Sequence, residues 1–138
     1  MGVDILTKDV EFRVSEIATL SIWDIGGQRR FDFIRSTFYK GAAGVIFIFD
    51  LTRVETFTEI RNWFTEIIHF TGYRPFLLIG NNANLLKQDE NELLKKEARG
   101  FAKNEGGFYI ETSPNDIDIV EDAICILTRR ITDLRVRN

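Results

Sequence analysis

Cysteine, proline and histidine are scarce in this sequence, and each shortage excludes a class of protein. The 138 residues include one cysteine, two prolines and one histidine. Cys125 therefore has no partner for an internal disulfide, and no group of cysteine and histidine residues has the spacing of a metal site. The low proline content, with 44% hydrophobic and 28% charged residues, is typical of a globular protein rather than a disordered one. We expect a single domain over residues 1–138, located in a reducing cytoplasm.

Neither sign of charge is in large excess, and no apolar run is long enough to cross a membrane. Lys and Arg number 18 and Asp and Glu number 21, so the net charge is -3. This balance provides no field for a polyanion, and nucleic acid is not an expected partner. A spanning helix needs about 18 or more apolar residues in a row, which the sequence does not contain. Membrane contact is not expected either, although Arg129, Arg130, Arg135 and Arg137 make the C-terminal end basic.

Five segments have the composition of β-strands, namely residues 10–14, 19–24, 44–51, 76–80 and 107–111. The third and fourth are apolar almost throughout, as in parallel strands covered by helices on both faces. In the first segment, Val10, Phe12 and Val14 alternate with Glu11 and Arg13. A short link joins it to the second segment, so the first two segments predict an antiparallel hairpin at the edge of a sheet.

Three stretches between and after these strands carry apolar residues at helical spacing, namely residues 57–68, 94–101 and 120–134. Thr56 is a candidate N-cap for the first helix, and Asn115 or Asp116 for the last. Gly106 and Gly107 are expected to end the middle helix. The alternation of strand and helix from residue 44 onward predicts βαβ units, and therefore an α/β sheet with helices on both faces.

The string Trp-Asp-Ile-Gly-Gly-Gln at residues 23–28 combines three groups that phosphate chemistry uses. Asp24 places a carboxylate at the end of a predicted strand, Gly27 can present its backbone N–H, and Gln28 adds a carboxamide. The carboxyl ends of strands are where α/β sheets bind ligands. Taken alone, the same residues also fit a strand end followed by a solvated turn. At this string, the chain resembles the Ras superfamily of small GTPases, whose switch segment reads Asp-x-x-Gly-Gln.

The resemblance extends in order over nearly the whole chain. Leu78-Ile79-Gly80-Asn81 is similar to the entry of the family's base-recognition motif, and Glu111-Thr112-Ser113 to its second base-recognition loop. Residues 31–52 resemble the second switch, its helix and the following strand. The resemblance implies a three-layer α/β fold of the P-loop NTPase type, with a mostly parallel sheet and an antiparallel edge hairpin.

The resemblance also implies roles for individual residues. In the family, the position of Asp24 holds magnesium through a water molecule, that of Gly27 donates its N–H to the terminal phosphate, and that of Gln28 orients the attacking water. The positions on the guanine side are occupied here by Asn81, Asn84 and Ser113. The implied ligands of a complete site are GTP or GDP with Mg²⁺.

The phosphate-binding string of this fold does not occur in the sequence. A nucleoside triphosphatase of this type needs Gly-x-x-x-x-Gly-Lys-Ser/Thr to hold the phosphates and the magnesium ion.

The chain begins one residue after the place of the first switch's Thr, so we expect the family's first strand and first helix to be missing. That strand lies in the family between the segments matching residues 19–24 and 45–49. Each backbone group left unpaired and buried there costs about 1 to 3 kcal/mol. We expect one of three arrangements to fill this gap. The two halves of the sheet close up directly, residues 1–10 are redirected, or a second chain supplies a strand.

The base-recognition motifs are altered as well. The family's Asn-Lys-x-Asp reads Asn81-Asn82-Ala83-Asn84 here, so an amide replaces the carboxylate that accepts two hydrogen bonds from guanine. The NH₂ group of the Asn84 amide would face one of the N–H donors of guanine, at a cost of about 1 to 3 kcal/mol. In the second loop, Pro114 stands where the family donates a backbone N–H, and proline has none.

These departures favour a degenerate member that, on its own, neither binds nor hydrolyses GTP, so that its site residues are vestigial and no cofactor is expected. Its expected role is protein interaction, through the segment 26–40 from Gly26 to Lys40 or through the open sheet position, with a homodimer by strand exchange as one form. One alternative is a GTP-hydrolysing switch whose phosphate loop comes from upstream sequence or a partner chain. Another is binding of a different nucleotide, because Asn84 suits a base edge that offers an acceptor.

Overall fold

The computed structural model describes residues 3–25 and 41–137 of the chain. Within these ranges the order of elements is β1 (Val3–Arg13), β2 (Glu16–Ile25), β3 (Val45–Asp50), α2 (Val54–Thr71), β4 (Phe76–Asn81), the 3-10 helix η2 (Ala83–Leu85), α3 (Glu92–Asn104), β5 (Phe108–Glu111) and α4 (Ile117–Arg137). All the strands and helices predicted from residue patterns are therefore confirmed. The main difference in bounds is β1, which begins seven residues earlier than its alternating segment, at Val3 rather than Val10.

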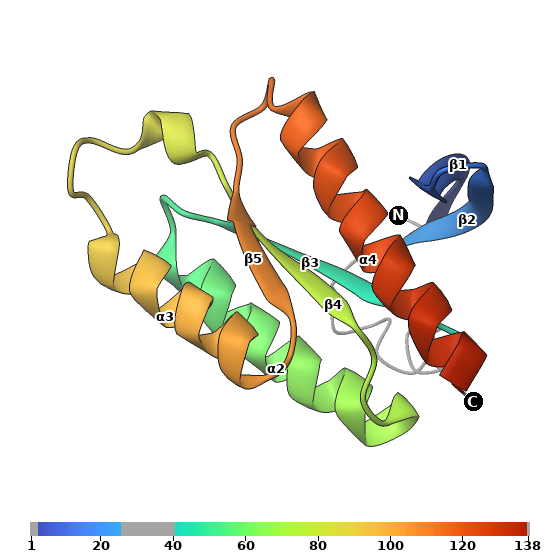
Figure 1. Cartoon of the computed structure of the whole chain (residues 1–138). Coiled ribbons are helices and arrows are strands. Elements are labelled where there is room, and N and C mark those ends of the chain that lie inside the picture. The colour runs from blue at the N-terminus through green and yellow to red at the C-terminus, as the bar shows by residue number, and fades with distance from the viewer. Residues whose placement is uncertain (1–2, 26–40, 138) are drawn as a thin grey trace.

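The described strands form two separate sheets, as Figure 1 shows. β3, β4 and β5 make a parallel sheet in that order, with Val45 beside Phe76 and Leu77 beside Phe108. β1 and β2 make an antiparallel hairpin in which Val10 lies opposite Ala18. The predicted hairpin is confirmed, but its placement at the edge of one common sheet is wrong for the described residues, because no hydrogen-bonded ladder joins β2 to β3.

Helices cover both faces of the parallel sheet, as predicted. On one face, α2 and α3 enclose the largest part of the core, which includes Phe47, Phe57, Ile60, Phe76 and Ala98. On the other face, Ala123 and Leu127 of α4 pack against Leu77 and Ile79 of β4. β4 lies in the middle of the sheet, and the side chains of Phe76, Leu77 and Leu78 are at most 1% exposed. The apolar run of the fourth segment therefore has the predicted environment. The third segment has it only in part, because Ile48 of β3 is 57% exposed.

The hairpin packs mainly against α4, beside which it lies in Figure 1, and Ile46 of β3 also packs against this contact. Val10 and Phe12 of β1 pack against Ile124 of α4. Ion pairs flank this contact, with Lys8 Nζ 2.7 Å from Glu121 Oε1 and Arg13 Nη2 2.6 Å from Asp133 Oδ1. Arg129 Nε–H also donates to the backbone carbonyl of Phe12. One side of α4 therefore packs against the parallel sheet and another side packs against the hairpin.

The helix ends follow the predicted signals in part. The N-cap of α2 is Arg53, which makes no side-chain capping bond, so the prediction of Thr56 as the cap is wrong. The helix begins two residues before Thr56, whose hydroxyl donates to the Arg53 carbonyl instead. Gly106 does follow the end of α3, with φ of 81°. Its N–H donates to the Lys103 carbonyl and that of Gly107 to the Ala102 carbonyl, which is a Schellman motif.

None of the helices in the described ranges is long and apolar enough to span a membrane.

Candidate functional site

The candidate site lies at the carboxyl edge of the parallel sheet, where three loops meet. β3 ends at Asp50, β4 at Asn81 and β5 at Glu111. Because the strands are parallel, their carboxyl ends lie at one edge of the sheet, which is the edge where α/β folds bind ligands. Backbone hydrogen bonds join the loops, since Leu51 N–H donates to the Asn81 carbonyl at 3.0 Å and Thr112 N–H to the Gly80 carbonyl at 2.9 Å.

Asp50 organises the loop between β3 and α2. Its Oδ1 accepts the backbone N–H of Thr52 at 2.9 Å and the Thr52 hydroxyl at 2.7 Å. The Asp50 N–H donates to the hydroxyl of Thr56, at 2.9 Å. The bonds from Thr52, with smaller contributions from the Asn82 side chain and the charge of Arg53, lower the pKa of Asp50 below its ordinary value. This loop is therefore built around an ionised carboxylate.

Asn81 ties the end of β4 to the loop after β5. Its Oδ1 accepts the hydroxyl of Thr112 at 3.1 Å, and Thr112 is buried. The amide oxygen of Asn81 is thus already engaged inside the protein. In this structure Asn81 holds two loops together, which is a structural task whether or not a ligand binds nearby.

Asn84 and Ser113 meet at the same edge. The backbone N–H of Asn84 donates to Ser113 Oγ at 3.1 Å, and the N–H of Ala83 donates to the Thr112 carbonyl at 3.0 Å. Ser113 is held in turn, because its N–H donates to Asp116 Oδ2 at 2.8 Å. The side chain of Asn84 is exposed. The structure therefore brings together the three residues assigned to the guanine side, namely Asn81, Asn84 and Ser113.

The phosphate-side residues are not brought to these loops by the described part of the chain. Asp24 lies near the end of β2, opposite Asp4, and is exposed. Gly27, Gln28 and the rest of the segment 26–40 lie outside the described residues. Within residues 3–25 and 41–137, no group of three or more His, Cys, Asp or Glu side chains could hold a metal ion.

Sequence reasoning missed the role of Asp50. Its signal is present, since an Asp followed two residues later by Thr at the end of a strand favours an Asx turn. Asp50 and Asn81 also line a small cavity of about 230 Å³ at the site, together with Ile48, Phe49, Thr56, Glu59 and Trp63. This cavity is smaller than the range of about 300 to 1,000 Å³ usual for small-molecule pockets.

Comparisons with known proteins agree on one family. The model of the Ras family matches residues 1–133. Ras-related protein RABA5b from Arabidopsis thaliana is 34% identical over 132 residues, covering 95% of this chain and 59% of the relative. Ras-related protein Rab-39A from Mus musculus is 32% identical over 136 residues, covering 97% of this chain and 62% of the relative.

A third relative is GTP-binding protein YPTC5 from Chlamydomonas reinhardtii, which is 32% identical over 135 residues, covering 94% of this chain and 65% of the relative. The chain thus spans about three fifths of the length of these curated relatives. The family match over nearly the whole chain, the α/β architecture and the meeting of Asn81, Asn84 and Ser113 at one sheet edge together place this protein in the Ras family of small GTPases.

Proposed function

We propose that this chain, on its own, neither binds nor hydrolyses GTP and that it serves as a protein-interaction module built on the small-GTPase fold. The observation that carries the proposal is the state of the two base-binding loops. Both loops are formed, yet one presents the Asn84 amide in place of a carboxylate and the other contains Pro114, which has no N–H to give. Guanine therefore meets a mismatched donor at one loop and a missing donor at the other.

The phosphate side supports the same proposal. The 138 residues contain no Gly-x-x-x-x-Gly-Lys-Ser/Thr, whose N–H groups, lysine and hydroxyl hold the triphosphate and its magnesium ion in related folds. Asp24, Gly27 and Gln28 cannot replace it, because they are one carboxylate, one backbone N–H and one carboxamide.

The open position between β2 and β3 supports the interaction role. Val45 and Leu51 direct their N–H groups toward β4 and its flanking residues, so those of Ile46 and Ile48 face the opposite edge of β3. The Ile48 side chain is 57% exposed. No described residue forms a ladder with this edge. We infer that this is the place of the strand that the family has there, and that an added strand could pair with β3.

The partner we propose is a protein, which binds at this open position or through the segment 26–40. A second copy of the chain that exchanges a strand is one form of such a partner. The alternative function, a GTP-hydrolysing switch completed by a phosphate loop from elsewhere, differs in requiring bound nucleotide.

Nucleotide analysis tests the proposal. The chain is purified without denaturation, and nucleotide released on denaturation is identified by mass spectrometry, with Chlamydomonas YPTC5 treated identically as the positive control. Titration calorimetry with GTP and GDP in the presence of Mg²⁺ follows. We expect no released nucleotide and no measurable heat of binding for this chain. Guanine nucleotide bound in near-stoichiometric amount would refute the proposal and favour the switch.

Light scattering tests the homodimer form, with Ile48→Pro as the informative variant. Proline removes the Ile48 N–H, which faces the open edge, and leaves the ladder between β3 and β4 intact, as edge strands allow. If strand exchange forms the dimer, the wild-type mass is that of two chains and the variant is monomeric. The control is Ile17→Ala on the hairpin, which is expected to leave the mass unchanged. A second proline variant, Ile119→Pro, is not a suitable control because Ile119 lies inside α4.

A further inference from the structure

The second open edge of the parallel sheet is that of β5, at the end of the strand order. Thr112 N–H donates to the Gly80 carbonyl, so the peptide groups of Phe108 and Ile110 also face β4. Those of Tyr109 and Glu111 face outward. Among the described residues, nothing bonds to the backbone of these two residues. β5 therefore offers two N–H and two carbonyl groups to an added strand.

This edge borders a cavity of about 740 Å³. Gly107, Phe108 and Tyr109 line it from the strand. Ala102 of α3 and Leu134 of α4 stand on either side, so the cavity runs between two helices as an open groove. Tyr73 also lines it, and its hydroxyl donates to the Gly106 carbonyl at 2.8 Å.

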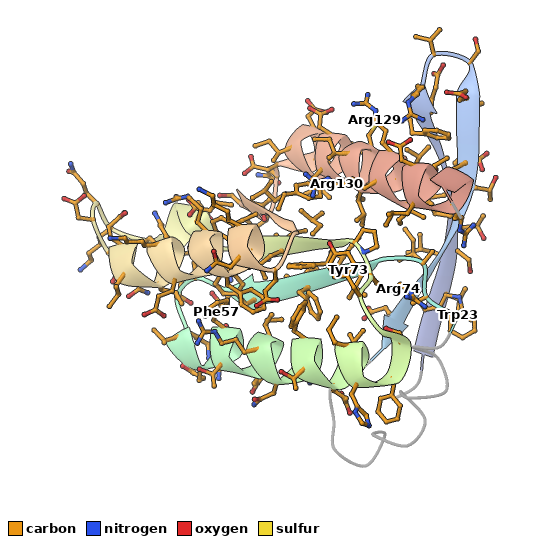
Figure 2. All side chains as sticks on the ribbon, turned by 60° about the horizontal axis from the view of Figure 1, so that its bottom comes forward. Trp23, Phe57, Tyr73, Arg74, Arg129 and Arg130 are labelled. Atoms are coloured by element: carbon orange, nitrogen blue, oxygen red, sulfur yellow. The ribbon has the colours of Figure 1, made fainter. Side chains whose placement is uncertain are left out.

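The groove carries positive charge that no described residue neutralises. Arg99 and Lys103 line it from α3, and Arg130 lines it from α4, where its guanidinium lies 4.6 Å from the centre of the Phe108 ring. None of these three forms an ion pair within residues 3–25 and 41–137. Figure 2 shows Arg130 on α4 and Tyr73 on the loop before β4.

The acidic side chain that lines the groove is already paired, and so is that of Glu111 on β5. Asp133 lines the groove, but its Oδ1 lies 2.6 Å from Arg13 Nη2 of the hairpin. Glu111 accepts the Tyr109 hydroxyl at 2.8 Å and lies 3.9 Å from Lys95 Nζ. The groove therefore has an excess of three cations on a protein whose net charge is -3.

From the free backbone edge and the unpaired cations together, we propose that the β5 groove binds an acidic, extended segment of a partner protein, which adds to the sheet as a further strand. Side chains of an added strand alternate between its two faces. One face meets Arg99 and Lys103 on α3, and the other meets Arg130 on α4. Adjacent acidic residues in the segment thus reach cations on opposite sides. The backbone pairing supplies affinity, and the charges supply the preference for acidic residues.

The inference is independent of the nucleotide question, because this groove lies at the amino ends of β4 and β5, opposite to the base-binding loops. Three fluorescein-labelled peptides test it by polarisation with the full chain. The first has three repeats of Val-Glu-Glu, the second three repeats of Pro-Glu-Glu, and the third three repeats of Val-Lys-Lys. We expect saturable binding of the first peptide alone, since proline removes the N–H groups that a strand needs and lysine repels the groove.

Charge reversal locates the site. The double variant Lys103→Glu with Arg130→Glu reverses two groove cations. The matched control is Lys96→Glu with Arg135→Glu, which makes the same charge change on the same two helices away from the groove. Circular dichroism verifies that both variants are folded. We expect about tenfold or greater weakening of Val-Glu-Glu binding in the groove variant and at most a small change in the control.

Amide hydrogen exchange tests the strand itself. Bound peptide should protect the amides of Tyr109 and Glu111, while those of Phe108 and Ile110, already bonded to β4, stay as they are. Equal binding of the Pro-Glu-Glu peptide would overturn strand addition and leave only an anion site, as would displacement of the peptide by inorganic phosphate at equal charge. Protection confined to other strands, equal weakening in both double variants, or tighter binding to phosphatidylserine vesicles would likewise overturn the proposal.

Discussion

At the scale of single residues, Asp50 is the side chain on which the candidate site most depends. Its carboxylate accepts two hydrogen bonds from Thr52 and fixes the turn between β3 and α2. Folding therefore favours its ionised form, and the pKa of Asp50 in the folded state is below its ordinary value of 3.8. A carboxylate of this kind stabilises the protein above its unfolded-state pKa, and this stabilisation is lost as the pH falls through the folded-state pKa.

The variant Asp50→Asn tests this dependence. We expect it to be less stable than wild type at neutral pH, by an amount that stays constant down to about pH 5 and shrinks below that, as the wild-type carboxylate becomes protonated. Urea unfolding of both proteins at several pH values measures the difference. A difference that is the same at pH 2.5 and at pH 7 would mean that the turn does not depend on the charge of Asp50.

The residues of the candidate site were predictable to the extent that a motif names them. Asn81, Asn84 and Ser113 were found from their resemblance to base-binding loops, and the structure places them together. Asp50 was not found, although the spacing of Asp50 and Thr52 that favours its turn is present in the sequence. The assignments to Gly27 and Gln28 remain predictions, since both lie outside the described residues.

At the scale of elements, the end of α3 shows how backbone geometry selects glycine. Gly106 has φ of 81°, which an L residue with a side chain adopts only with strain. A Cβ added at Gly106 would lie 3.1 Å from the Tyr73 hydroxyl oxygen, which itself bonds to the Gly106 carbonyl. By contrast, Gly100 lies inside α3 and a Cβ there would meet nothing within 4 Å. The two glycines therefore have opposite effects on stability.

Replacing each with alanine tests that contrast. We expect Gly106→Ala to destabilise the protein by about 1 to 2 kcal/mol, because alanine is forced into the left-handed region. Gly100→Ala should stabilise it by about 0.5 to 1 kcal/mol, because alanine restricts the unfolded chain and favours the helix interior. Urea denaturation of both variants gives the two values. Effects of the same sign would contradict the assignment of Gly106 to the helix end.

Elements were predicted well because their signals are local. The alternation of Val10 and Phe12 and the helical spacing of Leu94, Ala98 and Phe101 depend only on the chain's own period. The cap of α2 was assigned wrongly to Thr56, since a threonine ahead of an apolar stripe looks the same whether it precedes the helix or lies in its first turn. For α4, the helical spacing did not indicate that Ala123 and Ile124 face different partners.

At the scale of the whole molecule, α4 couples two sheets that share no ladder. No periodicity in the sequence indicates which strands pair, so a gap between β2 and β3 was expected only from the family resemblance, which places a further strand between them. The hairpin depends on a small apolar cluster of Val10, Phe12 and Ile124. The parallel sheet has a much larger core on its other face. Unequal burial of this kind predicts that the hairpin opens before the sheet unfolds.

Phe12→Ala separates these two events. Phe12 is 6% exposed, and removing its ring should cost about 3 to 5 kcal/mol of hairpin stability. Because β4 has its own core, we expect native-state hydrogen exchange to show faster exchange for the amides shared by β1 and β2 and little change for Leu77 to Ile79. Ile17→Ala, at a position 65% exposed on the same hairpin, is the control and should change neither group by more than about 0.5 kcal/mol.

The result decides whether α4 transmits the loss of the hairpin. If Phe12→Ala raised exchange equally in β4, the molecule would unfold as one unit, and the ion pairs of Lys8 and Arg13 with α4 would be part of that cooperativity. If only the hairpin responds, the hairpin can move away from the open edge of β3 without unfolding the parallel sheet. A partner strand could then enter at the cost of the hairpin contacts alone, which is a smaller free energy than that of the whole domain.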